Sequence, residues 1–118
     1  MTIHERAVLN VTLLELRGRV TLTDGTELLK DTLQRLMDQG CTNLVLDFQH
    51  VPYIDSTAMA VVIRTHSTLR RQGRSGLKLL GVAGYVLELL TVTQLSSVLE
   101  IFDSEADAVA SFSPGPRS

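Results

Sequence analysis

Five short stretches of the sequence are rich in apolar and β-branched residues and lack helical spacing, which is typical of β-strands. The continuous apolar run Leu44–Phe48 is typical of a strand buried on both faces, as in a parallel sheet. The first two stretches are separated at Asn10, a residue that tolerates turns, so they predict a hairpin. The five predicted strands are Ile3–Leu9, Val11–Leu16, Leu44–Phe48, Leu77–Val82 and Val98–Phe102.

Between the strands, apolar residues recur every three or four positions, which predicts amphipathic helices. The first helix is expected to begin at Asp24 and Glu27, which have the spacing of a capping box, and to end at Gly40 in a left-handed cap. Two shorter helices are predicted over Gly84–Thr91 and after Ser104, a capping residue. The inward stripe of the first helix is predicted to consist of Leu29, Leu33, Leu36 and Met37.

The second helix is predicted to begin at Asp55-Ser56-Thr57, three short oxygen-bearing side chains that can accept hydrogen bonds from unpaired backbone N–H groups. At 100° per residue, its core-facing stripe would include His66, which is expected to be a hydrogen-bonded core histidine. Val61 falls on the opposite stripe, where it would be a small apolar spot exposed beside the helix N-terminus. The full core-facing stripe is predicted to be Met59, Val62, Ile63, His66 and Leu69.

Strands that alternate with helices after an opening hairpin predict an α/β fold: a mixed, mostly parallel sheet with an antiparallel strand at one edge, covered by about four helices. The chain has 118 residues, of which 44% are hydrophobic and 20% charged, the size and composition of one globular domain. We expect that domain to span residues 1–112. Residues 113–118, rich in proline, glycine and serine, are expected to be a flexible tail.

Charge and composition argue against several classes of partner. The net charge of −2, with two tyrosines, three phenylalanines and no tryptophan, does not favour nucleic-acid binding. No leader sequence or stretch of 18 apolar residues indicates membrane insertion, and the single Cys41 forms no internal disulfide. We therefore expect a cytoplasmic protein that is a monomer or weak dimer.

The sequence lacks the patterns of common catalytic and cofactor sites. His4, His50 and His66 are too scattered for a metal site, and neither a P-loop nor a GxGxxG loop is present. These observations predict a protein that is not an enzyme, with no metal and no cofactor. One charged cluster remains near the end of the second helix, and it is either a solvated face or a contact for an acidic partner. It consists of Arg64, Arg70, Arg71, Arg74 and Lys78.

The segment from Leu44 to Met59, with its strand, short link and Asp-Ser-Thr, resembles the signature of the STAS domain, best known from bacterial anti-sigma factor antagonists. The resemblance extends from Thr2 to Phe112 in the order of elements and includes a turn at Gly18. Three positions depart from the family pattern. Ala58 replaces the usual glycine, Met59 replaces the usual leucine, and Thr21 stands where many antagonists have an acidic residue.

The resemblance implies that Ser56 is a phosphoacceptor for a partner that is both an anti-sigma factor and a serine kinase and that supplies the ATP site. It also implies a partner-binding surface around this serine, whose other members are Asp55, Thr57, Ala58, Val61 and Arg64. From its spacing alone, the Asp-Ser-Thr group is interpreted only as a helix cap. A second implied function is a non-catalytic STAS subunit, either of a signalling assembly or of a membrane lipid-transport complex. A receiver domain is disfavoured because Asp47 and Asp55 lack acidic companions.

Overall fold

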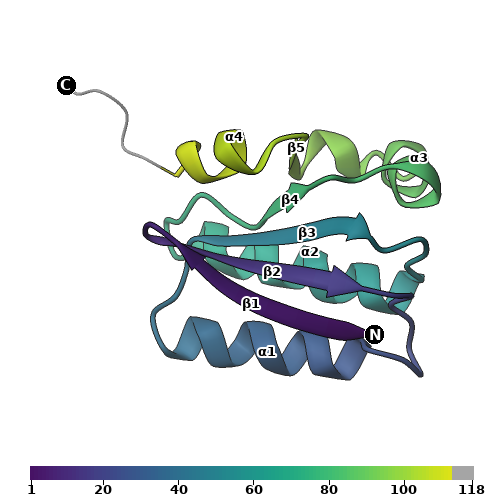
Figure 1. Ribbon diagram of the computed structural model, residues 1–118, viewed down its shortest axis with the longest axis horizontal. Coiled ribbons are helices and arrows are strands. Elements are labelled where there is room, and N and C mark those ends of the chain that lie inside the picture. The colour runs from purple at the N-terminus through teal and green to yellow at the C-terminus, as the bar shows by residue number, and fades with distance from the viewer. Residues whose placement is uncertain (113–118) are drawn as a thin grey trace.

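Strand β1 (Thr2–Val8) forms one edge of a five-stranded sheet in the computed structural model, which describes residues 1–112 (Figure 1). The sheet order follows the chain order, β1-β2-β3-β4-β5, with β1 antiparallel to β2 and all later pairs parallel. This topology confirms the predicted mixed sheet with an antiparallel edge strand. The remaining elements are β2 (Val11–Arg17), α1 (Thr26–Asp38), β3 (Leu44–His50), α2 (Ser56–Arg71), β4 (Lys78–Leu80), α3 (Gly84–Val92), the 3₁₀ helix η1 (Leu95–Ser97), β5 (Glu100–Phe102) and α4 (Glu105–Ala110).

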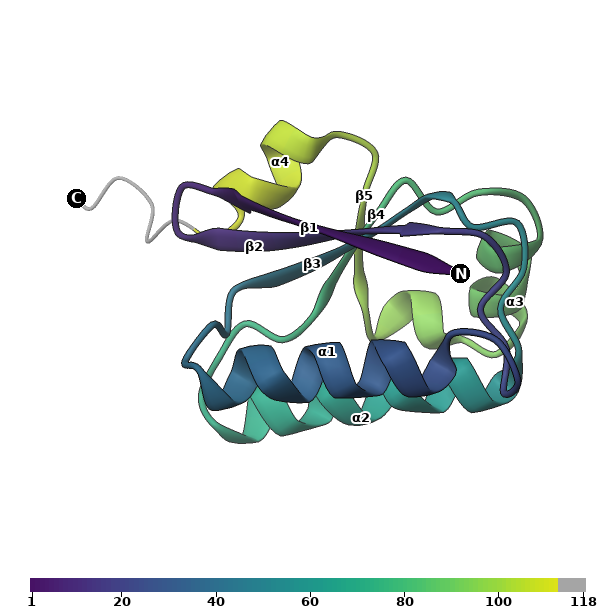
Figure 2. The ribbon, with the colours of Figure 1, turned by 60° about the horizontal axis from the view of Figure 1, so that its bottom comes forward.

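The helices cover the two faces of the sheet unequally. Successive parallel strands are added in one direction, and because such crossovers are right-handed, α1 and α2 lie on the same face (Figure 2). The larger hydrophobic core lies between them and the sheet and includes Leu46 and Phe48 of β3. A smaller core lies beneath α4 on the opposite face and includes Val45. Strand β3 is thus buried on both faces, as its continuous apolar run predicts.

The two last strands are shorter than the sequence predicts. Gly81, with φ +71°, turns the chain away after β4, although its N–H still donates to the carbonyl of Phe102 at 2.9 Å. Before β5, Val98 and Leu99 of the predicted strand belong instead to the turn that follows η1, and their N–H groups donate to the Leu95 carbonyl. Local turn hydrogen bonds therefore replace strand pairing at both places.

The predicted capping box at the start of α1 is wrong. The N-cap is Gly25, with φ +99° and no side-chain cap, and the Asp24 carboxylate instead accepts a hydrogen bond from the Met1 amino group at 2.9 Å. The end of the helix is confirmed. Gly40 is left-handed at φ +82°, and the N–H of Cys41 donates to the Leu36 carbonyl at 2.8 Å.

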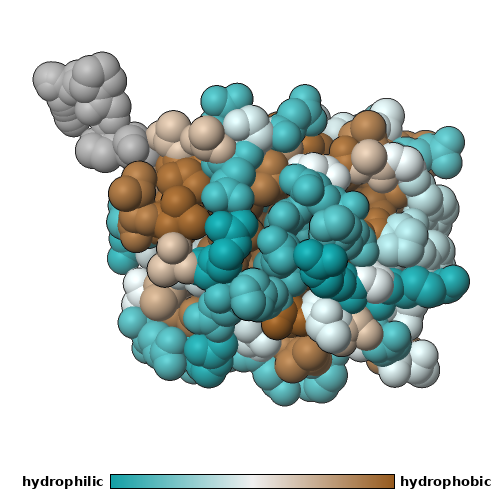
Figure 3. Space-filling view, in the orientation of Figure 1, coloured by the Kyte–Doolittle hydropathy of each residue, from teal (hydrophilic) through white to brown (hydrophobic). Residues whose placement is uncertain are grey.

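The face of the sheet that α1 and α2 leave uncovered has a band of hydrophilic side chains across it (Figure 3). Part of this band is an ion-paired group in which Arg6 contacts Glu105 at 2.7 Å and Glu15 at 3.8 Å. The Arg6–Glu105 hydrogen bond raises the pKa of the arginine and lowers that of the glutamate. These three charged groups therefore satisfy one another within the chain. The predicted tail, 113–118, lies outside the described residues.

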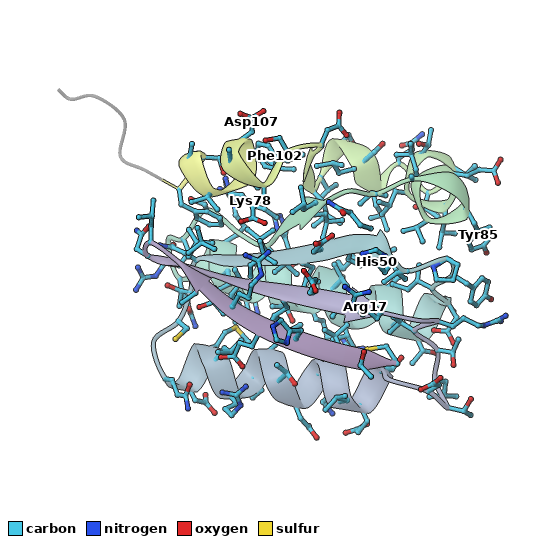
Figure 4. The ribbon with its side chains drawn as sticks, in the orientation of Figure 1. Arg17, His50, Lys78, Tyr85, Phe102 and Asp107 are labelled. Atoms are coloured by element: carbon cyan, nitrogen blue, oxygen red, sulfur yellow. The ribbon has the colours of Figure 1, made fainter. Side chains whose placement is uncertain are left out.

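Lys78 does not belong to the basic cluster predicted at the end of the second helix. It is 3% exposed and lies between the sheet and α4. Figure 4 shows it beneath α4, beside Phe102. Its ammonium group contacts Glu100 at 2.6 Å and lies 4.6 Å from the centroid of Phe112. Strand pairing directs Lys78 to the same face as Val45, which is opposite to α2.

Candidate functional site

Helix α2 begins as the sequence predicts. Asp55 is its N-cap, with an extended backbone, and its Oδ1 accepts a hydrogen bond from the N–H of Ala58 at 2.9 Å. Ser56 is the first helical residue, and its side chain is exposed, whereas Thr57 is half-buried. A hydroxyl group therefore lies at the positive end of a helix of 16 residues, where solvent and other molecules reach it.

The second carboxylate oxygen of Asp55 binds a different part of the chain. Its Oδ2 accepts from the N–H of Leu22, in the β2–α1 loop, at 2.8 Å. The same two loops pair at Val20 and Ile54, and the N–H of Asp55 donates to the Val20 carbonyl at 3.2 Å. The pKa of the Asp55 carboxyl is held below its ordinary value, chiefly by the hydrogen bond from Ala58 and further by the one from Leu22. Asp55 is thus an ionised bridge between the two loops.

An apolar groove of about 430 Å³ adjoins Ser56, between α2 and α3. Ser56 itself lines it, and Arg64 and Thr93 contribute its polar part. The sequence did not predict this groove, because Leu89 of α3 and Thr93, the C-cap of α3, come from a segment separated from α2 by β4. Its apolar lining residues are Met59, Ala60, Ile63 and Leu89.

Two tyrosines connect the loop before α2 to the start of α3. Tyr53 and Tyr85 stack with ring centroids 5.0 Å apart and an interplanar angle of 22°. Arg19 lies over the Tyr53 ring at 4.7 Å. Tyr85 projects from the α3 end of the molecule (Figure 4) and is 45% exposed. The stack fixes α3 beside α2 and so helps to define the groove.

The STAS domain family model matches residues 3–108. This chain belongs to the STAS domain family. None of the curated proteins matches it significantly in sequence.

Solved structures share the STAS fold with this chain at low sequence identity. An anti-sigma factor antagonist from Mycobacterium paratuberculosis has a TM-score of 0.83 at 14% identity, with 94% of this chain and 92% of that chain covered. The phosphorylated form of SpoIIAA, a Bacillus cell fate determinant, has a TM-score of 0.73 at 16% identity, with 93% and 98% covered. A sulfate transporter family protein from Wolinella succinogenes has a TM-score of 0.69 at 22% identity, with 90% and 87% covered.

Two of the predicted partner-binding residues are buried in the STAS domain. Ala58 is fully buried, and Val61 is 6% exposed within the larger core. The prediction that Val61 forms an exposed apolar spot is therefore wrong. Ile63, which the sequence assigns to the core-facing stripe, is half-buried and lines the groove. Arg64 is exposed, as its position on the outer stripe predicts.

His66 is a hydrogen-bonded core histidine, as predicted. Its Nδ1 accepts from the N–H of Leu77 at 3.1 Å, and the side chain lies against Gly76. Among the described residues, no group of three or more His, Cys, Asp or Glu side chains could hold a metal ion. Within residues 1–112, no helix combines the length and apolar character needed to cross a membrane.

Proposed function

We propose that this STAS domain is an anti-sigma factor antagonist, a protein-interaction switch that phosphorylation of Ser56 controls. In its unmodified form it binds an anti-sigma factor that is also a serine kinase, and this binding releases a sigma factor for transcription. The kinase supplies ATP and transfers phosphate to Ser56, after which the two proteins separate. We place this exchange in the cytoplasm, and the antagonist itself has no catalytic role.

The observation that carries the proposal is the exposed hydroxyl of Ser56 at the N-terminus of α2 and on the wall of an apolar groove. A partner that covers the groove must also cover this hydroxyl. Two anti-sigma factor antagonists with the same fold support this assignment, the Mycobacterium paratuberculosis protein and SpoIIAA, and SpoIIAA has been solved in a phosphorylated form. Asp55 has a positioning role, because both of its oxygens accept backbone hydrogen bonds.

Two opposing electrostatic effects decide what phosphorylation does. A phosphate on Ser56 adds about −1.5 to −2 charges. The dipole of α2 favours such a charge at its N-terminus by roughly 0.3–1 kcal/mol, so the fold tolerates it. Against a partner surface that fits a neutral hydroxyl, desolvation and like-charge repulsion cost several kcal/mol, or about a hundredfold in affinity. The second effect is larger, so the complex dissociates while the domain stays folded.

The test is to incubate the protein with its cognate kinase and ATP and to locate the phosphate by mass spectrometry. We expect modification of Ser56 that is absent from Ser56→Ala. In binding assays, Ser56→Asp should weaken the complex at least about tenfold, since it adds one charge instead of two. Ser96→Asp, which changes an exposed serine in η1 that does not line the groove, is the matched control and should bind normally. Equal binding by Ser56→Asp and the wild type would refute the switch.

A second candidate is a constitutive STAS subunit of a signalling assembly or a membrane lipid-transport complex. The fold shared with the Wolinella succinogenes protein favours a transport-related function. In that case, Ser56 would remain unmodified and the domain would co-purify with a transporter ATPase. Purification of the tagged protein from its native cell, followed by mass spectrometry of the bound proteins, distinguishes the two candidates.

A further inference from the structure

Four arginines on and just after α2 have no acidic partner among the described residues. Every other described lysine or arginine contacts an acidic group, except Arg19, which lies over the Tyr53 ring. Within residues 1–112, the only side-chain hydrogen bond that these four arginines make is from Arg71 to the Thr68 hydroxyl at 3.3 Å. We call this group the arginine stripe, and it consists of Arg64, Arg70, Arg71 and Arg74.

The arginine stripe continues the surface of the groove along α2. At 100° per residue, Arg64 and Arg71 lie within about 20° of each other around the helix axis. Arg64 lines the groove directly. From Ser56 to Arg71 the helix rises about 22 Å, so the groove and the stripe together form one track about four turns long. Along this track, an apolar half next to Ser56 is followed by a positively charged half.

The helix dipole explains only part of this charge. Arg70 and Arg71 lie in the last turn of α2, where a positive charge interacts favourably with the helix C-terminus. Arg64 lies in the middle of the helix, where the dipole gives no such benefit. The chain as a whole has a net charge of −2, so the stripe is not part of a general excess of positive charge. A surface that is apolar at one end and positive along its length is complementary to an acidic, amphipathic partner.

We propose that the α2–α3 groove and the arginine stripe together bind an acidic amphipathic helix of the partner. Its apolar side chains enter the groove, and its carboxylates lie along the stripe. This inference rests on the proposed function and specifies the chemistry of the partner's contact segment. A helix of about 16 residues matches the length of the track.

The groove favours a helix over two other anionic partners. A bilayer surface does not enter a concave groove between two helices, whereas a row of side chains at i, i+3 and i+7 does. A single-stranded nucleic acid stacks its bases on aromatic rings, and no aromatic side chain lines this groove.

The experiment uses a display library of helical peptides of about 16 residues, with fixed apolar positions at helical spacing and random outer positions. The full chain is the target, and parallel selections use Arg64→Glu/Arg71→Glu and the control Lys30→Glu/Arg35→Glu. Both variants reverse two exposed positive charges on a helix. Circular dichroism establishes that each target is folded before selection.

We expect wild type and the control to enrich peptides rich in Asp and Glu, and the stripe variant to enrich peptides without this excess. The best acidic peptide should bind Arg64→Glu/Arg71→Glu at least about tenfold more weakly, and its affinity for the wild type should fall with rising salt. Failure to enrich any peptide, or enrichment without an acidic excess, overturns the inference. The inference is also overturned if the wild-type chain binds phosphatidylglycerol vesicles or a single-stranded RNA more tightly than the best peptide and the stripe variant no longer binds them. Because no kinase is used, these results are independent of whether Ser56 is phosphorylated.

Discussion

Replacement of Asp55 tests whether this residue connects the two loops beside Ser56. Asp55→Ala removes the acceptor for Ala58, a helix cap worth about 1 kcal/mol. It also removes the acceptor for Leu22, which is worth about 0.5–1 kcal/mol because that hydrogen bond is exposed to water. The expected loss in the free energy of unfolding is therefore about 1.5–2 kcal/mol. At about 4 °C per kcal/mol for a domain of this size, Tm should fall by roughly 6–8 °C.

Asp55→Asn separates the two contacts. The asparagine oxygen still caps the N–H of Ala58, but its NH₂ group replaces the oxygen that accepts from Leu22. We expect a smaller loss of about 0.5–1 kcal/mol. Amide exchange measured by NMR should accelerate at Leu22 and stay slow at Ala58. Asp31→Asn, at an exposed helix position, is the matched control and should change stability by less than about 0.5 kcal/mol.

The pH dependence provides an independent check on Asp55. Its pKa is lowered in the folded state, so the unfolded chain binds the proton more readily. The stability that the carboxylate contributes is therefore present above the ordinary value of 3.8 and is lost as the pH falls from there through the folded-state pKa. The difference between the wild type and Asp55→Ala should shrink over that range in denaturant titrations. A difference that is the same at neutral and acidic pH, or equal stability of Asp55→Ala and the wild type, would refute the reasoning.

Two further substitutions test the packing around the site. Gly76→Ala should lower the free energy of unfolding by at least about 2 kcal/mol, because a Cβ at φ +93° would lie 2.5 Å from His66. Gly73→Ala, at φ +79° with open space around it, should cost only about 1 kcal/mol, and equal losses in urea titrations would contradict this account. Lys78→Met should be neutral or stabilising, because Glu100 is exposed enough to remain hydrated, whereas Lys78→Ala should cost about 2 kcal/mol. A loss above about 1 kcal/mol for Lys78→Met would contradict this expectation.

The sequence predicted the sheet and the start of α2 correctly, because both depend on local signals. The continuous apolar run of β3 indicates burial on two faces. Asp55 has a short carboxylate that can accept a hydrogen bond from the first turn of a helix, and it is the N-cap of α2. The capping box at Asp24 failed because that carboxylate binds the Met1 amino group instead. Spacing along the chain contains no information about that contact.

The groove could not be predicted, because it depends on how α2 is rotated about its own axis. Val61 and Ile63 are both apolar, so the sequence pattern fits either as the buried residue. Helix α1 packs along one side of α2 (Figure 2). Val61 is buried in the larger core, whereas Ile63 is half-buried and lines the groove shared with α3. The periodicity thus predicts that α2 has a wide apolar arc, but its neighbours decide which end of this arc is exposed.

The arrangement around Ser56 suits a switch that changes its surface charge without changing its fold. Asp55 is already ionised and accepts backbone hydrogen bonds on both of its oxygens, so it has no positive charge or donor with which to compensate a phosphate on Ser56. Arg64 lies about 12 Å along α2 from Ser56, too far for direct contact with a phosphate there. A phosphate there would be favoured by the helix dipole, and its charge would act on whatever lies over the groove. In the proposed complex the partner's apolar side chains lie next to Ser56, so the dianion would weaken binding mainly because its charge must be desolvated against them.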